Sequence, residues 1–453
     1  HINEDIVKKY IHLGYCPEPE TVYQGIRALI PGQLMIINLS NGIIQREQIN
    51  QYNFDNISSS DFQNNQIKTI ELLLQACKRN LVADVNMSIA LSGGIDSSLV
   101  YAISNKTKSV QGITVRFSEK EYDEGNIAVE YAKLIGAPHV STEVEVDGKM
   151  ELLNRLLLHF DQPYADSSFI PFFFLCQKAS KYCKVLIGGF GGDEIHNGYA
   201  GHKYLPYIYR LSRSKFKFIL SSILIKSAKL FPTEYQRQIR KLCSLIRSKN
   251  LDELIFKWES WFPPDSELYP VNPFKYDCSV LVKNLNSETA NLSIHCGIEK
   301  TYFTGRMIGD YLRKSDMMSM INSIEFRVPM LDEDLVRHSF SIPYQQKSDI
   351  KSEKKILRAI HAGIFPPKYS KLKKKGFTIP LDTWLGHSNL LNIKQLLTVN
   401  DSFVCRYINK KYIEILFDSL DNNDTNYTSR AAVYQRILIL YSLELWHNHY
   451  MKQ

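Results

Sequence analysis

The sequence has no long apolar run. Its longest nearly apolar stretch, Phe169 to Cys176, is too short to span a bilayer, and no apolar segment follows a basic start at the amino end. These absences exclude a membrane-spanning protein and a secretory signal of the ordinary kind. We therefore expect a cytoplasmic protein that has no membrane partner.

Paired cysteines are also missing. The chain has eight cysteines, and they form no C-x-x-C pair and no metal-ligand spacing: Cys16, Cys77, Cys176, Cys183, Cys243, Cys278, Cys296 and Cys405. This scatter argues against a disulfide framework and against a zinc site. We expect buried free thiols in a reducing compartment.

Acidic residues are fewer than basic ones, which gives a net charge of +8. The basic residues concentrate in residues 203–249 and 351–375, and the first of these segments contains no recognisable nucleic-acid motif. Its spacings suit the solvated faces of helices. We therefore expect a polar helical surface there and no nucleic-acid partner.

The most informative stretch runs from Ala90 to Leu99, where a strand-like segment breaks into a glycine-rich turn and then a helix. Gly93 and Gly94 permit a close backbone approach, and the first turn of a helix offers N–H groups and serine hydroxyls to an anion. The lysine of a Walker A loop is missing. The pattern S-G-G-x-D-S-S resembles the pyrophosphate loop of ATP pyrophosphatases, and an unliganded tight turn is the alternative.

Strands and helices alternate between residues 67 and 200, as a parallel sheet with crossover helices requires. We expect strands at 88–91, 111–117, 139–144 and 184–187, with helices at 67–81 and 122–135. The loops at the carboxyl ends of such strands face one crevice. Residues 92–98, 116–119 and 188–194 should therefore surround the same ligand.

A second glycine-rich loop, Gly188 to Glu194, follows the last of these strands. Its four glycines indicate a backbone packed against something flat or anionic, and Asp193 lies where it could share a magnesium ion with Asp96. We expect Mg²⁺ to be held by these two carboxylates together with phosphate oxygens.

The flanking segments have a different character. Residues 1–50 hold turn signals and short β-prone runs that suggest edge strands of a larger sheet, and residues 51–66 are rich in Asn, Gln and Ser, as in a linker. Residues from about 200 to 310 and the C-terminal third are predicted to be helical. We expect Phe256, Trp258, Trp261 and Tyr269 to be packing residues, and residues 434–447 to form an amphipathic helix.

Several motifs in order make the chain resemble the synthetase half of the glutamine-hydrolysing asparagine synthetases, a family that includes β-lactam-forming and lasso-peptide-cyclising relatives. The resemblance covers nearly all of the sequence. The matching segments are 10–32, 91–98, 122–124 with Ala128, Asp161 and Pro163 with Gln162 in place of an acid, 315–320 with 325–332 in a long helical signature, 354–358 and 374–377.

This resemblance implies a doubly wound α/β fold of the ATP pyrophosphatase type over residues 67–453, with a remnant of a glutaminase domain at 1–50. It implies ATP and Mg²⁺ as cofactors and a small carboxylate, most simply L-aspartate, as the acceptor of ammonia. The ammonia would come from glutamine through a glutaminase domain that this chain lacks, or from a separate source. We expect a fragment, and a homodimer is one option for its assembly.

The resemblance also assigns residues. Lys374, Asp96 and Asp193 are the implied catalytic groups, with Lys374 on the leaving pyrophosphate and Lys354 as a second candidate. The implied ATP and pyrophosphate site is Leu91, Ser92, Gly93, Gly94, Asp96, Ser97, Ser98, Val115, Gly188, Gly189, Lys354 and Lys374. The implied acceptor site is Phe190, Glu194, Asp316, Glu325 and Arg327.

One departure from the family pattern concerns the acceptor. Phe190 stands where the family usually has an acid, and His196 and Asn197 replace an apolar residue and a glycine. A phenylalanine cannot handle a proton, so the acceptor could be another carboxylate, such as a uronic acid, or Glu194 could compensate. A catalytically lapsed binding module and a tRNA-modifying pyrophosphatase are further alternatives, although the latter would not carry E-F-R-V-P-M-L-D.

Overall fold

The computed structural model describes residues 1–49, 51–116, 125–144, 149–283, 289, 291–370, 381–421 and 428–452. Its centre is a five-stranded sheet in which every neighbouring pair is parallel, in the order β5-β4-β3-β6-β7. The strands are β3 (Met87–Ala90), β4 (Gln111–Arg116), β5 (His139–Glu143), β6 (Val185–Ile187) and β7 (Glu325–Arg327). The predicted parallel sheet is confirmed.

Strand β7 is the one that the sequence interpretation missed. Residues 325–332 were expected to continue a helical signature, but β7 pairs in parallel with β6 and places Phe326 beside Leu186. The ring of Phe326 packs edge-on against Phe172 at 5.0 Å. A three-residue strand is too short for its alternation to be recognised, and the contacts that stabilise it, with β6 and with Phe172, come from distant parts of the sequence.

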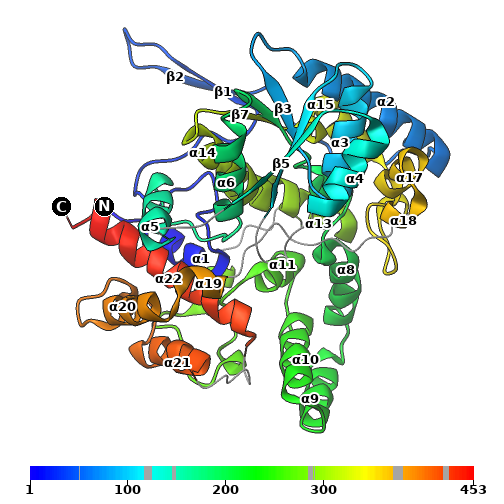
Figure 1. Cartoon of the computed structure of the whole chain (residues 1–453). Helices are drawn as coiled ribbons and strands as arrows, with labels where there is room; N and C mark the ends of the chain where they lie inside the picture. Colours follow the sequence, from blue (N-terminus) through cyan, green and yellow to red (C-terminus); the bar gives the residue numbers. More distant parts are fainter. Residues whose placement is uncertain are drawn as a thin grey trace.

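Helices cover both faces of the sheet, and β6 shows how. Val185 and Ile187 point into one core, whereas Leu186 between them points into the other. The first core is built with α2 (Phe62–Asn80), α3 (Ile95–Asn105), α4 (Gly125–Ile135), α15 (Glu333–Ser341) and α17 (Lys355–Ile364). The second is built with α5 (Lys149–His159), α6 (Phe169–Ala179) and α14 (Arg313–Met320). Figure 1 shows the two layers.

The predicted helical part near residues 200–310 is confirmed. It comprises α8 (Ala200–Ser212), α9 (Lys217–Ala228), α10 (Thr233–Ile246), α11 (Leu251–Glu259), α12 (Cys278–Lys283), α13 (Ile294–Thr301) and the π-helical η2 (Tyr302–Leu312). Residues of α8, α10, α11, α13 and η2 share a small core of their own. Phe256 and Tyr269 are buried, as expected of packing residues.

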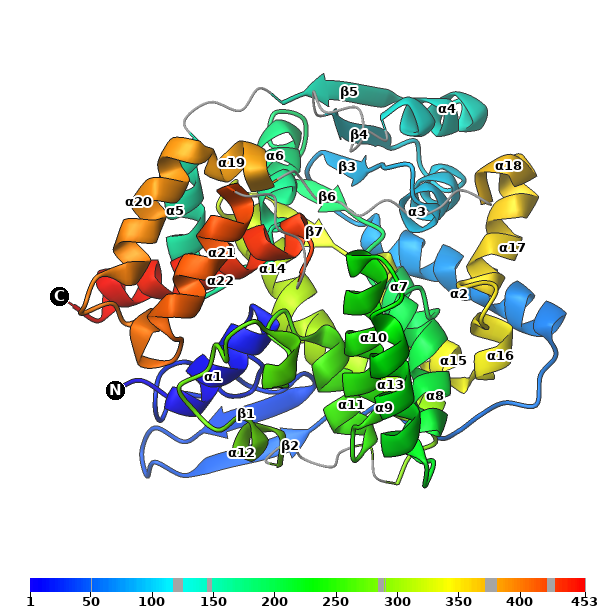
Figure 2. The same cartoon turned by 90° about the horizontal axis from the view of Figure 1, so that it is seen from below.

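The C-terminal helices are α19 (Leu381–Leu385), α20 (His387–Thr398), α21 (Lys410–Asp421) and α22 (Arg430–Tyr450). Helix α22 is longer than predicted and is buried at every position from Val433 to Glu444. The expectation of an amphipathic helix was therefore wrong, because neighbouring elements enclose α22. Figure 2 shows this helical group on one side of the sheet and α2 and α17 on the other.

The N-terminal segment divides in two. Helix α1 (Glu4–Leu13) lies in the main core, where the Tyr10 hydroxyl donates to the Ile439 carbonyl of α22 at 2.9 Å. Strands β1 (Gln33–Ile37) and β2 (Ile44–Gln48) instead form a separate antiparallel sheet that exposes most of its side chains. The expected strands exist, while α1 was not anticipated and α2 begins before the predicted start at Ile67.

Two expectations about the whole chain can be compared with the structure. The eight cysteines are free, and all except Cys405 are buried, as predicted. Among the residues that the structure describes, no helix combines the length and the apolar character needed to cross a bilayer.

Candidate active site

The order of the strands creates a switch point between β3 and β6. The chain moves from β3 outward through β4 to β5, and then returns to place β6 on the opposite side of β3. The loops that leave β3 and β6 therefore diverge from one crevice at the carboxyl edge, which is where open α/β sheets bind ligands. The two glycine-rich loops identified from the sequence are these two loops.

Hydroxyl groups organise the loop after β3. The Ser92 N–H donates to Ser97 Oγ at 3.1 Å, and the hydroxyls of Ser92 and Ser97 lie 2.9 Å apart. Helix α3 begins at Ile95 with Gly94 as its N-cap, and glycine has no side chain to cap the first amides. This arrangement leaves the first turn of α3 suited to an anionic ligand.

The loop after β6 packs directly on the loop after β3. A Cβ atom at Gly189 would lie 2.6 Å from the Ser97 nitrogen, and one at Gly192 would lie 2.5 Å from Asp96 Cγ. Only glycine allows such a close approach. The sequence suggested packing against something flat or anionic, and for these two positions the neighbour is the first loop itself.

Lys354 joins the two loops. Its Nζ lies 2.5 Å from Asp96 Oδ2 and 2.6 Å from Asp193 Oδ1, and only 5% of the residue is exposed. Burial alone would lower the pKa of Lys354, but the carboxylates of Asp193 and Asp96 outweigh it and raise that pKa above its usual value. Lys354 therefore stays charged between two acids.

The backbone conformation at Lys354 is unusual. Lys354 precedes α17 with a φ of 53°, in the left-handed region that side chains other than glycine rarely adopt. A strained conformation of this kind is retained where the surroundings fix it, often at functional positions. Lys374, the other candidate lysine, lies outside the described residues.

The carboxylates fit a magnesium site in their chemistry. Asp96 and Asp193 come from different loops and both contact one ammonium nitrogen, so a single cation can lie between them. Oxygen ligands from one or two carboxylates, completed by phosphates and water, are what Mg²⁺ takes in nucleotide enzymes.

The remaining predicted pyrophosphate and nucleotide residues lie on β4, in the two loops or in the first turn of α3. Ser98 Oγ lies 3.1 Å from His361 Nε2 of α17, a contact that the sequence gave no sign of. Leu91 and Val115 are buried at the ends of β3 and β4, and Gly188 accommodates the ring of Phe326. The predicted loop at 116–119 lies outside the described residues from position 117 onward.

The structure pairs two of the five predicted acceptor residues, since Arg327 Nε lies 2.7 Å from Glu325 Oε1. Glu194 is buried beside the switch point and accepts a hydrogen bond from the Tyr199 hydroxyl. Glu325 lies at the amino end of β7, and Arg327 donates to the carbonyls of Asn80 and Val82 at the end of α2. Asp316 is exposed on α14.

Phe190 is committed to packing. Its ring centroid lies 5.4 Å from that of Phe172 and 5.3 Å from that of Phe326. The apolar residue at this position is thus part of an aromatic cluster beneath the loop. No ligand is needed to explain why a phenylalanine stands there.

Sequence reasoning missed a buried polar cluster behind Glu194. Lys314 Nζ lies 2.9 Å from Asp166 Oδ2 and 4.0 Å from Asp310 Oδ1. Burial, reinforced by the negative charge of Asp166, raises the pKa of Asp310 to about 7. The motif at 315–320 lies on α14, but nothing in the sequence shows that Asp166, Asp310 and Lys314 come together beside it.

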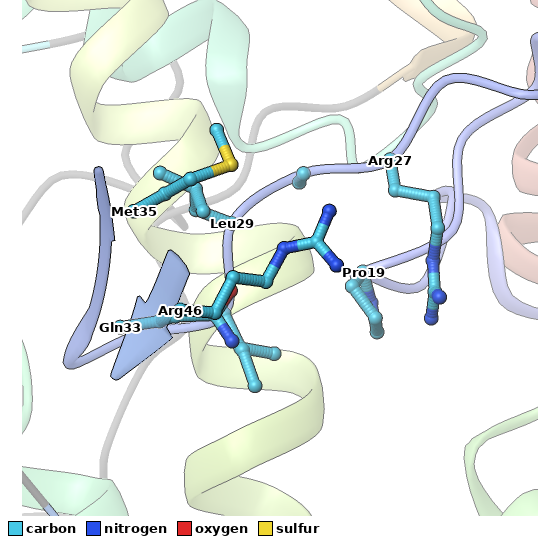
Figure 3. A pocket seen from close by; sticks show the side chains of 8 residues that line it. Pro19, Arg27, Leu29, Gln33, Met35 and Arg46 are labelled. Atoms are coloured by element: carbon cyan, nitrogen blue, oxygen red, sulfur yellow. The ribbon is translucent and has the colours of Figure 1, made fainter. Parts of the chain in front are cut away.

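The cavity drawn in Figure 3 lies elsewhere, between the segment after α1 and the β1–β2 sheet. It has a volume of about 230 Å³ and is lined by Pro19, Arg27, Ala28, Leu29, Ile30, Gln33, Met35 and Arg46. None of these residues belongs to the loops at the switch point. We do not assign this cavity to the candidate active site.

Comparisons with known proteins identify the family of this chain. The chain is 27% identical over 99% of its length to asparagine synthetase [glutamine-hydrolyzing] 1 of Bacillus subtilis, and spans 69% of that protein. It is 27% identical over 86% of its length to a putative asparagine synthetase of Mycobacterium tuberculosis, and spans 60% of it. A solved NMN synthetase from Francisella tularensis overlaps 31% of the chain with 15% identity and a TM-score of 0.23, too little for any argument. The family model for asparagine synthase matches residues 68–448, and the chain therefore belongs to the asparagine synthase family.

Proposed function

We propose that this chain activates a carboxylate with ATP and converts it to an amide. The observation that carries this proposal is the convergence of Asp96 and Asp193 on Lys354 at the switch point of the sheet. The loop after β3, with its serine hydroxyls and uncapped helix start, suits the β and γ phosphates of ATP. The proposed nucleotide site also includes Leu91, Val115, Gly188 and Gly189.

The proposed reaction has two steps. A carboxylate oxygen of the acceptor attacks the α-phosphorus of ATP, the bond to the bridging oxygen breaks, and pyrophosphate leaves. Ammonia then attacks the acyl carbon, loses a proton, and displaces AMP to leave the amide. Mg²⁺ held by Asp96 and Asp193 would neutralise charge on the phosphates.

Cationic side chains are suited to the leaving pyrophosphate. Charge that develops on this group during the first step is stabilised best by a cation already in place. Lys354 is such a cation, because packing and two ion pairs hold it. Lys374, outside the described residues, is the family motif's candidate for the same role.

We propose L-aspartate as the acceptor and the neighbourhood of Glu194 as its site. Glu194 accepts a hydrogen bond from the Tyr199 hydroxyl, and Lys314 pairs with Asp310. Tyr311 connects the two pairs, since its ring centroid lies 5.9 Å from that of Tyr199 and 4.8 Å from Lys314 Nζ. A uronic acid is the alternative acceptor, since Phe190 offers no acid. Asp316, Glu325 and Arg327 remain candidates for acceptor binding on the ground of the sequence motif alone.

The domain assignment is also a proposal. Residues 67–453 would be the synthetase part, and ammonia would come from a glutaminase domain that the β1–β2 sheet adjoins. Support comes from the apolar side chains which that sheet exposes, including Ile36 and Ile44, and from the relatives' glutamine-hydrolysing names. The chain spans only part of those relatives' length.

The test is pyrophosphate release from Mg-ATP with ammonium and an isotopically labelled acceptor. L-aspartate, a panel of uronic acids and no acceptor would be compared, with Asp96→Ala as the blank and the exposed Asp401→Ala as the matched control. An ¹⁸O-labelled carboxylate should pass one ¹⁸O to AMP. Label in inorganic phosphate with ADP would overturn adenylation, and no release with any acceptor would favour a lapsed binding module.

A further inference from the structure

The helical pair α9 and α10 carries an apolar surface that nothing in the chain's described part covers. Phe216, Ile219, Ile223 and Leu230 are 69%, 60%, 59% and 85% exposed. Ile219 and Ile223, four positions apart, lie on one face of α9, and Phe216 and Leu230 stand just before its first residue and just after its end. Only Ser221 and Ala228 of α9 are buried.

The opposite face of α9 explains how the helix is held. Ser221 lies there, and its hydroxyl accepts from Arg247 Nε at 2.9 Å while its carbonyl accepts from the Cys243 thiol at 3.5 Å. Lys217 Nζ donates to the Ser248 carbonyl at 2.9 Å. Helix α9 is thus held along α10 through small and polar groups and through Leu224, which packs on the core of the helical part, whereas Ile219 and Ile223 point away.

More apolar side chains extend the surface at the start of α9 and around the turn between the helices. Phe218, Phe231 and Tyr235 are 60%, 50% and 55% exposed. A cluster of exposed aromatic and aliphatic residues of this kind marks an interaction site. Figure 1 shows α9 and α10 at the lower end of the molecule, away from the sheet and from the candidate active site.

The charge around this surface has one sign. Between residues 195 and 251 the sequence contains twelve lysines and arginines and a single acid, Glu234. Lys215, Lys226 and Lys229 are exposed on α9 or beside it, next to the apolar face. The expectation of a merely solvated basic helix surface therefore does not account for the exposed phenylalanines and isoleucines.

We propose that the α9 face, defined as Phe216, Ile219, Ile223 and Leu230 with its flanking lysines, binds the surface of an anionic lipid bilayer. An exposed apolar surface with lysines beside it lies in the interface, with the apolar side chains among the acyl chains and the charges at the headgroups. Acidic headgroups would supply the negative charge that this segment lacks. The inference goes beyond the proposed amidation and does not depend on it.

The experiment is cosedimentation of the full chain with vesicles of phosphatidylcholine, alone or mixed with an equal part of phosphatidylglycerol. We expect binding only to the acidic vesicles, and weaker binding as salt is raised. Phe216→Ser with Ile223→Ser should weaken binding by on the order of tenfold or more, because the inserted apolar area is lost. Lys226→Glu with Lys229→Glu should weaken it as well.

Matched variants control for nonspecific hydrophobic and electrostatic binding to vesicles. Ile36→Ser with Ile44→Ser removes apolar residues of similar exposure from the β1–β2 sheet, and Lys410→Glu with Lys411→Glu changes an exposed pair on α21. Both should bind acidic vesicles as the unchanged chain does. Ile223→Trp should bind as the unchanged chain does and show a shift of fluorescence to the blue with acidic vesicles that the chain's own four tryptophans do not give, which reports insertion.

Three results would overturn the proposal. One is the absence of binding to acidic vesicles. Another is an equal loss in the control variants, or RNA binding that the serine variants leave unchanged, which would make the surface purely electrostatic. The third is self-association in sedimentation that Phe216→Ser with Ile223→Ser abolishes, which would make the α9 face an interface between copies of this chain.

Discussion

Replacing Lys354 by methionine should make the protein's stability depend on magnesium. The substitution keeps most of the side-chain volume and removes the charge that lies 2.5 Å from Asp96 and 2.6 Å from Asp193. Two carboxylates, 16% and 11% exposed, would then lose the positive charge of Lys354. Removing one partner of a buried ion pair costs about 3–5 kcal/mol. In a chain of this size such a loss lowers Tm by several degrees.

Magnesium should restore much of this loss. A divalent ion at about 100 times its Kd stabilises the folded state by about 2.7 kcal/mol, provided that it does not bind the unfolded chain. In the unchanged protein Lys354 already lies between the carboxylates, so added Mg²⁺ should raise Tm less. The assay is thermal unfolding with EDTA or with MgCl₂, without nucleotide.

Lys355→Met is the matched control for this prediction. Lys355 is the next residue along and pairs with Asp349 at 2.6 Å, with 26% of its side chain exposed. Its loss should cost no more than about 1 kcal/mol. If Lys354→Met melts together with the unchanged protein, or if Mg²⁺ raises both Tm values equally, the reasoning about this ion pair is refuted.

Three further predictions concern other parts of the molecule. Gly198→Ala should abolish pyrophosphate release and lower Tm, because its Cβ would lie 1.9 Å from Asp193 Oδ1 and 2.2 Å from Lys354 Cε. Gly363→Ala, which has open space around its Cβ, should keep activity. Equal activity and equal Tm of the two variants would contradict this prediction. Lys347→Met should lower the free energy of unfolding in urea by about 3–5 kcal/mol, because the buried Glu299, 2.8 Å from Lys347, loses the cation it pairs with. A loss below about 1 kcal/mol would contradict this prediction. Burial lowers the pKa of His12 to about 4, of His202 to about 3 and of His196 well below its usual value, so only the unfolded chain gains these protons as pH falls below 6.5. Between pH 7.5 and 5.5 the three together should cost about 4 kcal/mol, offset by about 2 kcal/mol from Asp310, whose raised pKa of about 7 makes its folded form take up a proton. Tm should therefore fall over this range, and a Tm that rises or stays constant would show that these histidines are not held neutral.

Local patterns were enough to predict the sheet and its two loops. Alternating apolar residues indicate the strands, and the glycines after Leu91 and Ile187 indicate where they end, because both signals depend on the local backbone alone. The position of Asp193 beside Asp96 then followed from the rule that parallel strands meet at one edge. Strand β7 was missed because its pairing with β6 is a tertiary contact.

The site was harder to predict than the loops. Lys354 reaches Asp96 across 258 positions of sequence, through a left-handed backbone conformation that no residue pattern announces. Arg327 carries a motif but donates to carbonyls at the end of α2. A motif identifies a segment of the chain. Whether a side chain in that segment faces the crevice or stabilises the fold depends on its tertiary contacts.

The bond between Tyr10 and Ile439 ties α1 to α22 across 429 positions. During synthesis at about 5–20 residues per second, α1 would wait about 20–90 s before its partner leaves the ribosome. Ile6, Val7, Tyr10 and Ile11, all buried in the finished protein, need protection from wrong partners over that interval. The order of translation thus makes this short helix the natural place for a chaperone to act and for folding to fail.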